Sequence, residues 1–556
     1  MRYGYRLFWM AIVLAVVFAQ CTSSQSAKDE SYDVVIYGGS SAGVTAALQC
    51  ARLGRSVVLI EASEHIGGLT SGGLGATDIG NKAAIGGLAR QFYQLLWQHY
   101  AKDASWTWQK RSEYRSVRQQ SSERTMWTFE PSVAEATLRG MLAKHEIKLV
   151  TKERLNRRDG IQMSDGRISA IRMESGRSFA GRMFIDTSYE GDLMALAGVS
   201  FTVGRESKSR YGESLNGIQV KNAVHHQFVV PVDPYVVAGD KSSGLLPGIT
   251  EGPLPPDGSG DHRVQAYCFR MCITDIPENR AEWVKPKDYD EKLYELLFRN
   301  FEAGDMRIPW SPIWMPNRKT DTNNNFAVST DFIGHNYEWP NASYAERERI
   351  FARHLSYQQG LLWSLAHHPR VPEQIRKHFQ KYGPAKDEFV DHGNWPHQLY
   401  VREARRMVSD YVMTQHDCQG RRRAKDAVGL AAYTMDSHNI QRYVDEHGHV
   451  RNEGDVQVGG FPPYPISYRS IRPKKSECKN LLVPLCLSAS HIAYGSIRME
   501  PVFMVLGQSA ASAASLAIQE GVAVQDIPIK ALQQRLLADG QVLDWAEAKG
   551  RTSTHR

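Results

Sequence analysis

An α/β protein is the fold class that the sequence predicts, and three observations predict it. A short apolar run, Asp33–Tyr37, leads directly into the glycine-rich turn Gly38–Gly43. A helical pattern and a second apolar run, Ser56–Ile60, come next. That run ends at the acid Glu61. A strand, a glycine turn, a helix, a strand and an acid in this order are typical of a Rossmann-like dinucleotide-binding domain.

The glycine-rich turn carries the residues that we expect to hold a pyrophosphate. Gly38 permits a tight turn, the small Ser40 lets the backbone approach phosphate, and Gly43 lets the helix pack on the sheet. Free N–H groups and the helix dipole stabilise phosphate charge. Glu61 lies 23 residues after Gly38, which suits an acid that accepts hydrogen bonds from a ribose hydroxyl. The predicted phosphate-binding residues are Gly38, Gly39, Ser40, Ser41 and Gly43.

A second glycine-rich segment distinguishes between two dinucleotides. Gly67 and Gly68 follow shortly after Glu61, and this doublet resembles the extended FAD fingerprint of the glutathione-reductase-like flavoproteins. No second glycine motif follows a strand, so a separate nicotinamide domain is not expected. His65 is a position for a covalent flavin, although a loop histidine more often only lines a site. The prediction is non-covalent FAD.

The first part of the cofactor domain is expected to close with a β-meander over residues 147–184. A strand that ends at Asp186 and Thr187 should then return beside the first strand. In flavoproteins of this class such a strand ends near the cofactor. Both residues are therefore predicted to bind it.

The second part is expected after residue 478, where an apolar run at 480–484 precedes a helix over 502–519. In related flavoproteins a late helix of this kind points its N-terminus at the flavin pyrimidine ring. By that similarity we expect its positive end to stabilise the reduced, anionic flavin. Gly507 and Gln508 are the predicted cofactor-binding residues of this helix, and a tightly packed core helix is the alternative.

These segments together predict a Rossmann-like FAD-binding domain with a large inserted α+β substrate or cap domain. The insertion is rich in aromatic residues and histidine, with helices expected at 345–354 and 358–366. The predicted order is a signal peptide (1–20), a polar tether (21–31), the first part of the FAD-binding domain (32–203), the insertion (204–477), the second part (478–526) and a C-terminal tail (527–556).

Catalytic candidates are expected just before the late helix, over or beside the flavin. His491 is the predicted general base or acid, because its ordinary pKa is near neutrality. Tyr494 is predicted to share a proton relay, and Arg498 to stabilise a flavin or substrate anion. His335 and Arg402 are the candidates from the insertion. A purely structural role is the alternative for each.

The N-terminus is typical of an export signal. Arg2 and Arg6 precede the apolar run Leu7–Ala19, and Cys21 then opens a polar stretch. The pattern resembles a bacterial lipoprotein signal, from which Gln20 departs, and a simple secretory signal or an uncleaved anchor is the alternative. We expect an exported protein, periplasmic or anchored to a bacterial cell envelope by lipid at Cys21. No twin-arginine pair is present, so FAD would be added after export.

Charge and cysteine content exclude other classes. The formal net charge of +7 comes from no long Lys/Arg run, so nucleic acid is not an expected partner. Seven cysteines lack the spacing of an iron–sulfur cluster, and no metal is predicted. The expected partners are a small-molecule substrate and an electron acceptor that the sequence does not identify.

The chain resembles the bacterial FAD-dependent oxidoreductase family often called FAD_oxidored. The similarity lies in the runs at residues 35–43, 186–192, 319–323, 329–334, 395–406 and 490–501. This resemblance implies flavin chemistry but no particular substrate. We expect hydride to pass between flavin N5 and a small polar organic molecule. The export signal and the polar, aromatic insertion favour an alcohol or sugar derivative. The alternative is a lipoprotein that binds a ligand or glycan on a degenerate flavoprotein fold.

Overall fold

The computed structural model describes residues 30–120 and 122–546, and its largest sheet has the predicted Rossmann-like topology. The strand order is β3-β2-β1-β6-β5-β4, with β21 beside β6. Strands β1, β2, β3, β6 and β21 run parallel, whereas β4, β5 and β6 form the predicted antiparallel meander. The bounds are β1 (Glu30–Tyr37), β2 (Val57–Ile60), β3 (Lys148–Val150), β4 (Ile161–Ser164), β5 (Arg167–Arg172), β6 (Ser178–Asp186) and β21 (Leu481–Leu482).

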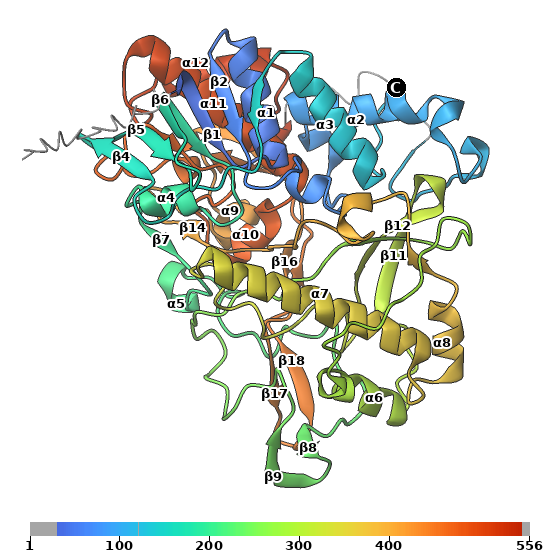
Figure 1. Cartoon of the computed structure of the whole chain (residues 1–556). Helices are drawn as coiled ribbons and strands as arrows, with labels where there is room; N and C mark the ends of the chain where they lie inside the picture. Colours follow the sequence, from blue (N-terminus) through green and yellow to red (C-terminus); the bar gives the residue numbers. More distant parts are fainter. Residues whose placement is uncertain (1–29, 121, 547–556) are drawn as a thin grey trace, which may run out of the picture.

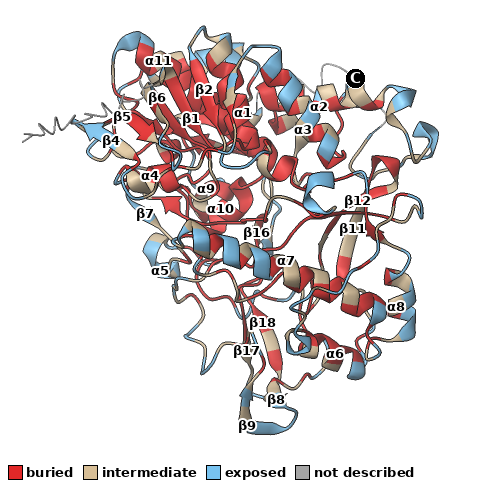
Figure 2. Ribbon diagram, viewed as in Figure 1, coloured by how far each residue is buried: buried red, intermediate tan, exposed pale blue. Residues whose placement is uncertain are grey.

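Burial explains why the central strands form where they do. Val34, Val35 and Ile36 of β1 have no exposed surface, and every residue of β2 is buried. Continuous apolar runs of this kind suit parallel strands that are covered on both faces. Figure 2 shows buried residues along β1, β2 and β6. Because β1 begins at Glu30, the last two residues of the predicted polar tether belong to the sheet.

Helices pack around this sheet, and one of them, α12, forms where a C-terminal tail was predicted. The chain end from residue 527 contains α12, whose Leu532 and Leu536 are fully buried, so this segment up to residue 546 belongs to the fold. The helices here are α1 (Ser41–Arg52), α2 (Gly87–Tyr100), α3 (Pro131–Ala143), α4 (Asp192–Leu196), α10 (His491–Ile497), α11 (Glu500–Glu520) and α12 (Ile529–Ala538).

The inserted region forms a second lobe, seen below the parallel sheet in Figure 1. Its antiparallel sheet has the order β11-β12-β10-β13. The two helices predicted at 345–354 and 358–366 are one continuous helix, α7, that crosses between the lobes (Figure 1). The bounds are β10 (Met271–Thr274), β11 (Trp310–Met315), β12 (Lys319–Asn324), β13 (Gly383–Pro384), α5 (Lys208–Tyr211), α6 (Glu295–Glu302), α7 (Tyr344–His367), α8 (Glu373–Phe379) and α9 (Gln415–Cys418).

Strand pairs complete the insertion, and some of them return to the first lobe. β15 packs on α11, and β16 packs on α10, so the later insertion shares a core with the cofactor domain. The pairs are β7 (Phe201–Thr202) with β14 (Arg406–Met407), β8 (Tyr235–Val237) with β9 (Asp240–Leu245), β15 (Ala427–Ala431) with β20 (Tyr464–Ser467), β16 (Met435–Ser437) with β19 (Val456–Val458), and β17 (Gln441–Val444) with β18 (Val450–Glu453).

Short 3₁₀ helices occur in the connections. They are η1 (Gly68–Thr70), η2 (Lys82–Ala84), η3 (Asp103–Ser105), η4 (Arg111–Glu113), η5 (Glu291–Tyr294), η6 (Pro316–Arg318), η7 (Val390–His392) and η8 (Tyr468–Ile471). Of these, η1 contains part of the predicted Gly67–Gly68 doublet.

Two features bear on the membrane and redox predictions. Within residues 30–120 and 122–546, α11 is long and apolar enough to cross a membrane by length and composition, yet 94% of its most apolar window is buried inside the fold. Every cysteine of this described part is a buried free thiol. The predicted signal peptide and Cys21 lie outside the described residues.

Candidate cofactor cleft and buried catalytic cluster

A cavity of about 430 Å³ opens at the carboxyl ends of β1 and β2, where doubly wound sheets bind their ligands. The turn after β1 and the segment after β2 form one side, and α7 of the insertion forms the other. Five of the predicted cofactor-binding residues line it: Gly38, Ser40, Glu61, Gly68 and Thr187.

The turn after β1 admits only glycine at two positions. Gly38 has a φ of +107°, and a Cβ there would lie 2.6 Å from the backbone of Thr187 and Ser188. A Cβ on Gly43 would lie 2.1 Å from the carbonyl oxygen of Gly38. Ser40 caps α1 by accepting from the Gly43 N–H at 3.3 Å. The turn therefore holds the positive end of α1 beside the cavity.

Glu61 is fixed at the end of β2 by backbone donors. One carboxylate oxygen accepts from the Gly39 N–H at 2.6 Å, and the other accepts from the Ser63 N–H at 2.7 Å. Glu61 also lines the cavity, where its carboxylate can accept hydrogen bonds from the ribose of a bound dinucleotide. That role stays a prediction.

The glycine doublet docks onto the same turn. The Gly67 N–H donates to the Gly39 carbonyl at 2.7 Å, and Gly67 bridges Ser40 as in a parallel ladder. A Cβ on Gly68 would lie 2.3 Å from the hydroxyl of Tyr189. These glycines let the turns pack closely, and the cavity beside them, lined by Gly38, Gly68 and Glu61, fits a dinucleotide.

Asp186 and Thr187 have different roles, and the prediction that Asp186 binds the cofactor is corrected. Thr187 lines the cavity and donates to the Gly38 carbonyl at 2.6 Å. The Asp186 carboxylate is fully buried and accepts from Ser188 and from the Met194 N–H at 2.9 Å. Burial raises its pKa to about 6. Its contacts are therefore internal, and they hold the turn between β6 and α4.

Part of the cavity wall was not predicted. Tyr344, Arg347 and Phe351 contribute from α7, Arg154 from the loop after β3, and His397 from the insertion. No local motif marks them, because the helical pattern of α7 does not tell which face meets the first lobe.

The first turn of the late helix, α11, meets the glycine-rich loops. The buried Glu500 carboxylate accepts from Ser41 Oγ at 2.6 Å, from Thr70 Oγ1 at 2.7 Å and from Tyr189 at 2.7 Å. These groups belong to α1, η1 and the turn after β6. The N-terminus of α11 thus lies against the glycine-rich loops, and Glu500 ties them together.

The prediction that Gly507 and Gln508 bind the cofactor is corrected. A Cβ on Gly507 would lie 2.2 Å from the Ala42 carbonyl, so this glycine allows α11 to cross α1 closely. Gln508 accepts from the Leu88 N–H at 2.8 Å and donates to Gln49 at 3.2 Å. Neither residue lines the cavity, since both lie in helix packing beyond the first turn of α11.

His491 and Tyr494 lie in the core next to this site. His491 has 2% exposure, with Nδ1 2.9 Å from both Glu403 oxygens and Nε2 3.2 Å from Ser437 Oγ. Both ring nitrogens are thus engaged by protein groups, which favours the structural alternative. Tyr494 is also buried, and burial raises its pKa well above the ordinary value, which opposes proton release.

Arg402 and Arg498 meet around Tyr400, whose position was not predicted. The Arg402 guanidinium lies 4.3 Å from the centre of the Tyr400 ring and donates to Asp331 at 2.6 Å. Arg498 donates to the Tyr400 hydroxyl at 3.0 Å and to Asp436 at 3.1 Å. The two predicted arginines therefore belong to one buried cluster.

His438 joins the cluster and was missed by the sequence interpretation. Its Nδ1 lies 2.8 Å from Asp331 Oδ2, and its Nε2 lies 3.6 Å from Asp436. Burial and the neighbouring Arg402 lower the pKa of His438. Burial alone would raise the pKa of Asp331, but Arg402 and His438 lower it overall. The aspartate thus remains charged and orients a neutral imidazole, as in catalytic Asp–His pairs.

Asp455 is a further unpredicted member, with 1% exposure and one carboxylate oxygen without a partner. Burial, with the nearby charges of Asp436 and Asp331, raises its pKa to about 8. A local sequence signal exists for neither His438 nor Asp455.

The prediction that His335 is a catalytic residue is corrected, because its contacts belong to the core of the insertion. Its ring stacks on Phe332 at 3.7 Å between centroids, and its Nδ1 lies 3.0 Å from the Arg353 guanidinium. Burial lowers its pKa to about 3.

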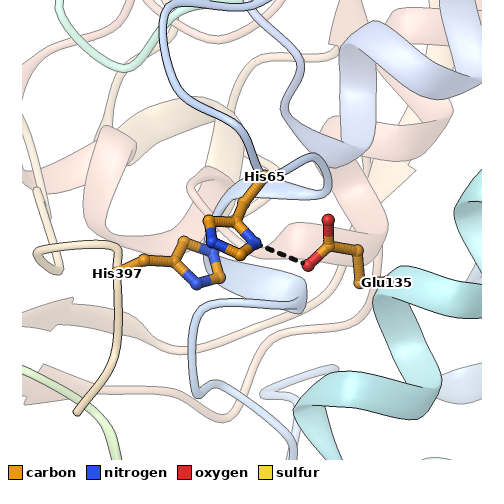
Figure 3. A group of neighbouring side chains, drawn as sticks. All are labelled: His65, Glu135 and His397. Carbon is orange, nitrogen blue, oxygen red and sulfur yellow. Dashed lines mark hydrogen bonds and ion pairs between the residues drawn. The ribbon is translucent and has the colours of Figure 1, made fainter. Parts of the chain in front are cut away.

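His65, Glu135 and His397 form a group beside the cavity, drawn in Figure 3. One nitrogen or oxygen of each lies within 4.8 Å of the others. The two imidazoles are stacked, with centroids 3.9 Å apart, so their nitrogens do not converge on one point. Both nitrogens of His65 face carboxylates, Glu135 at 3.0 Å and Asp391 at 3.1 Å. We assign the group to the cavity wall.

Comparison with known proteins adds the family context. A family model described as FAD dependent oxidoreductase matches residues 33–536. The vinyl phenol reductase of Lactiplantibacillus plantarum is 28% identical over 173 residues, which make up 27% of this chain and 35% of that protein.

Two solved structures are partly similar. The L-amino acid deaminase from Proteus vulgaris without its specific insertion is 16% identical, with 32% of this chain and 61% of that chain covered and a TM-score of 0.22. Thioredoxin reductase from T. acidophilum is 15% identical, with 32% and 38% covered and a TM-score of 0.17. TM-scores this low support no inference about this chain. In all three comparisons the chain matches less than two thirds of the other protein's length.

Proposed function

Because this chain belongs to the family of FAD-dependent oxidoreductases, we propose that it exchanges a hydride with a small polar organic molecule in a bacterial cell envelope. FAD is its cofactor, and the glycine turn, Glu61 and Thr187 are the residues that would hold it. The finer points, which are the substrate, the proton-transfer residue and the location, are argued below.

The Asp331–His438 pair is the observation that carries this proposal. A hydride that leaves or joins a carbon bearing oxygen requires a proton to leave or join that oxygen. FAD, when bound, supplies the hydride acceptor or donor. His438 supplies proton transfer at Nε2, because Asp331 occupies Nδ1 and fixes the ring. The side chains of His438 and Asp436 are 11% and 18% exposed, so both are only partly buried.

The cluster lies next to the loop that leaves the cofactor cavity. Gly73 follows the Gly67–Gly68 doublet closely, and a Cβ there would lie 1.9 Å from the Arg270 carbonyl. The Ala76 N–H donates to Asp321 at 3.0 Å, and Asp321 pairs with Arg270. Arg270 in turn lies 5.8 Å from the centre of the Tyr400 ring. One loop therefore lines the cavity at one end and is linked to the cluster through Arg270 at the other.

We place the protein in the envelope because of the sequence before the described residues. The basic start, the apolar run and Cys21 support export and lipid attachment. A ligand-binding lipoprotein on a degenerate flavoprotein fold is the second candidate. The intact glycine cradle and Glu61 disfavour it, and a purified protein without flavin would support it.

Anaerobic flavin reduction tests the proposal. The purified holoprotein is screened with alcohols, sugars and hydroxy acids for bleaching of flavin absorbance. With a substrate found, His438→Gln should retain FAD and slow reduction at least 100-fold, within the range typical of a lost general base. His491→Gln should reduce thermal stability and leave the rate within a few-fold. The opposite pattern would return the base assignment to His491.

A further inference from the structure

We propose that Arg402 and Arg498 bind a carboxylate group of the substrate, which makes the substrate a small organic acid. This inference rests on the proposed function and deepens it, since it assigns a chemical class to the ligand of the same cluster. It does not depend on the direction of the reaction.

Arg402 has donors that the protein leaves without a partner. Its side chain has 0% exposure, and its Nη2 donates to Asp331 and to the thiol sulfur of Cys268. Nε and Nη1 are buried and have no hydrogen-bond partner. No other arginine in residues 30–120 and 122–546 has two buried nitrogens that lack a hydrogen-bond partner. An unpaired buried donor is costly, so a ligand that pairs with it gains affinity.

Donors of two neighbouring residues are free beside it. Arg498 has 2% side-chain exposure and an unpaired Nε, although its Nη1 and Nη2 are engaged. Gln265 accepts from Arg498 through its carbonyl oxygen at 3.2 Å, whereas its Nε2 has no partner. All of the free atoms on these three side chains are donors.

A buried arginine elsewhere shows that this condition is not general. Arg205 also has 0% side-chain exposure, but its Nε, Nη1 and Nη2 donate to Asp261, Glu453 and Gly217. Every nitrogen of this structural guanidinium thus has a protein partner. Arg402 differs because part of its guanidinium is kept for a group that is not part of the protein.

The donor pattern selects a carboxylate. A carboxylate offers only acceptors, and its hydrogen bonds with guanidinium are charge-assisted and stronger than neutral ones. An amide offers one carbonyl acceptor but directs its N–H groups at the remaining donors, and a protonated amine offers no acceptor. Tyr400 fits this arrangement, because its hydroxyl accepts from Arg498 while its ring packs under Arg402.

Calorimetry on the FAD-loaded protein measures binding without turnover. The probes are lactate, malate and gluconate, each compared with a neutral analogue: lactamide, malamide and glucose. At least one carboxylate should bind at least tenfold more tightly than its analogue. Arg402→Gln should weaken that binding at least tenfold, and Arg402→Lys should recover part of it, since charge returns without the planar donors.

Arg205→Lys is the matched control, and it should leave carboxylate affinity unchanged. Flavin content is measured for every variant. No carboxylate preference in the wild type, or wild-type affinity in Arg402→Gln, would overturn the inference. So would a loss of FAD in Arg402→Gln with carboxylate binding intact, because the free donors would then serve the cofactor.

The two proposals fail in different ways. If a carboxylate binds through Arg402 but no compound in the screen reduces the flavin, the anion site stands and the proposed reaction fails. If a neutral sugar or alcohol reduces the flavin equally fast in wild type and Arg402→Gln, the reaction stands and the anion site fails.

Discussion

Gly43→Ala adds one methyl group at the tightest point of the cofactor cradle. The new Cβ would lie 2.1 Å from the Gly38 carbonyl oxygen and 2.9 Å from Thr187 Oγ1, whereas ordinary contacts of a Cβ begin at 3.4 Å. The start of α1 must therefore move away from the turn by about 1.3 Å. Without a ligand the turn can relax, but FAD requires the original spacing.

The expected loss of affinity follows from that clash. Overpacking of one carbon costs about 1–3 kcal/mol. Because about 1.4 kcal/mol corresponds to a tenfold change, FAD should bind roughly 5- to 150-fold more weakly to Gly43→Ala. The assay is titration of the apoprotein with FAD, followed by flavin fluorescence, with circular dichroism to verify that the fold is intact.

Gly140→Ala is the control for this substitution. Gly140 lies in α3, and nothing is within 4 Å of the position of its Cβ. This variant should keep wild-type FAD affinity and gain up to about 1 kcal/mol of stability, as alanine replaces glycine in a helix. Wild-type affinity in a folded Gly43→Ala variant would refute the reasoning.

Four further expectations concern other parts of the molecule. Glu61→Gln should weaken FAD binding without unfolding the protein, since an amide replaces the carboxylate that faces the ribose; unchanged affinity in the same titration would remove Glu61 from the site. Acid precipitation should leave the flavin in solution, because both nitrogens of His65 face carboxylates, whereas a yellow pellet would indicate a covalent link. Cys21→Ser should shift the protein from membranes to the soluble fraction or stall its processing, and a free thiol at Cys21 in the wild-type mass spectrum would contradict the anchor. Burial raises the pKa of Asp455 to about 8, so the native state binds one more proton than the unfolded chain between about pH 4 and pH 8. The free energy of unfolding should therefore fall as pH rises through this range, by up to about 1.4 kcal/mol per pH unit. Asp455→Asn should flatten this slope in thermal unfolding, and an unchanged slope would mean that another group causes it.

The sequence predicted the half of the cofactor site that is local in the chain. Gly38, Gly43 and Glu61 lie within one strand–turn–helix–strand unit, so their spacing alone determines which groups meet. The same holds for the return of β6, since parallel strands in such folds follow a small set of connections.

Other residues depend on packing between distant segments, which no spacing shows. Asp331 and His438 are 107 residues apart, and their contact requires two distant segments of the insertion to meet. Gly507 illustrates a different difficulty, because a small residue suits a close ligand and a close helix equally well. Only the position of Ala42 decides between them.

The cofactor cavity is assembled from widely separated parts of the chain. Tyr37, Glu61, Thr187, Tyr344 and His397 all line it, so the pocket exists only after most of the polypeptide has folded. FAD therefore binds the folded molecule, and the stability it adds rises with the logarithm of its concentration relative to its dissociation constant. Loss of the flavin should loosen α7 first, because the Arg347–Asp192 pair, which lines the cavity, joins this helix to the first lobe. Limited proteolysis of the apoprotein should accordingly start at the ends of α7, and added FAD should protect them.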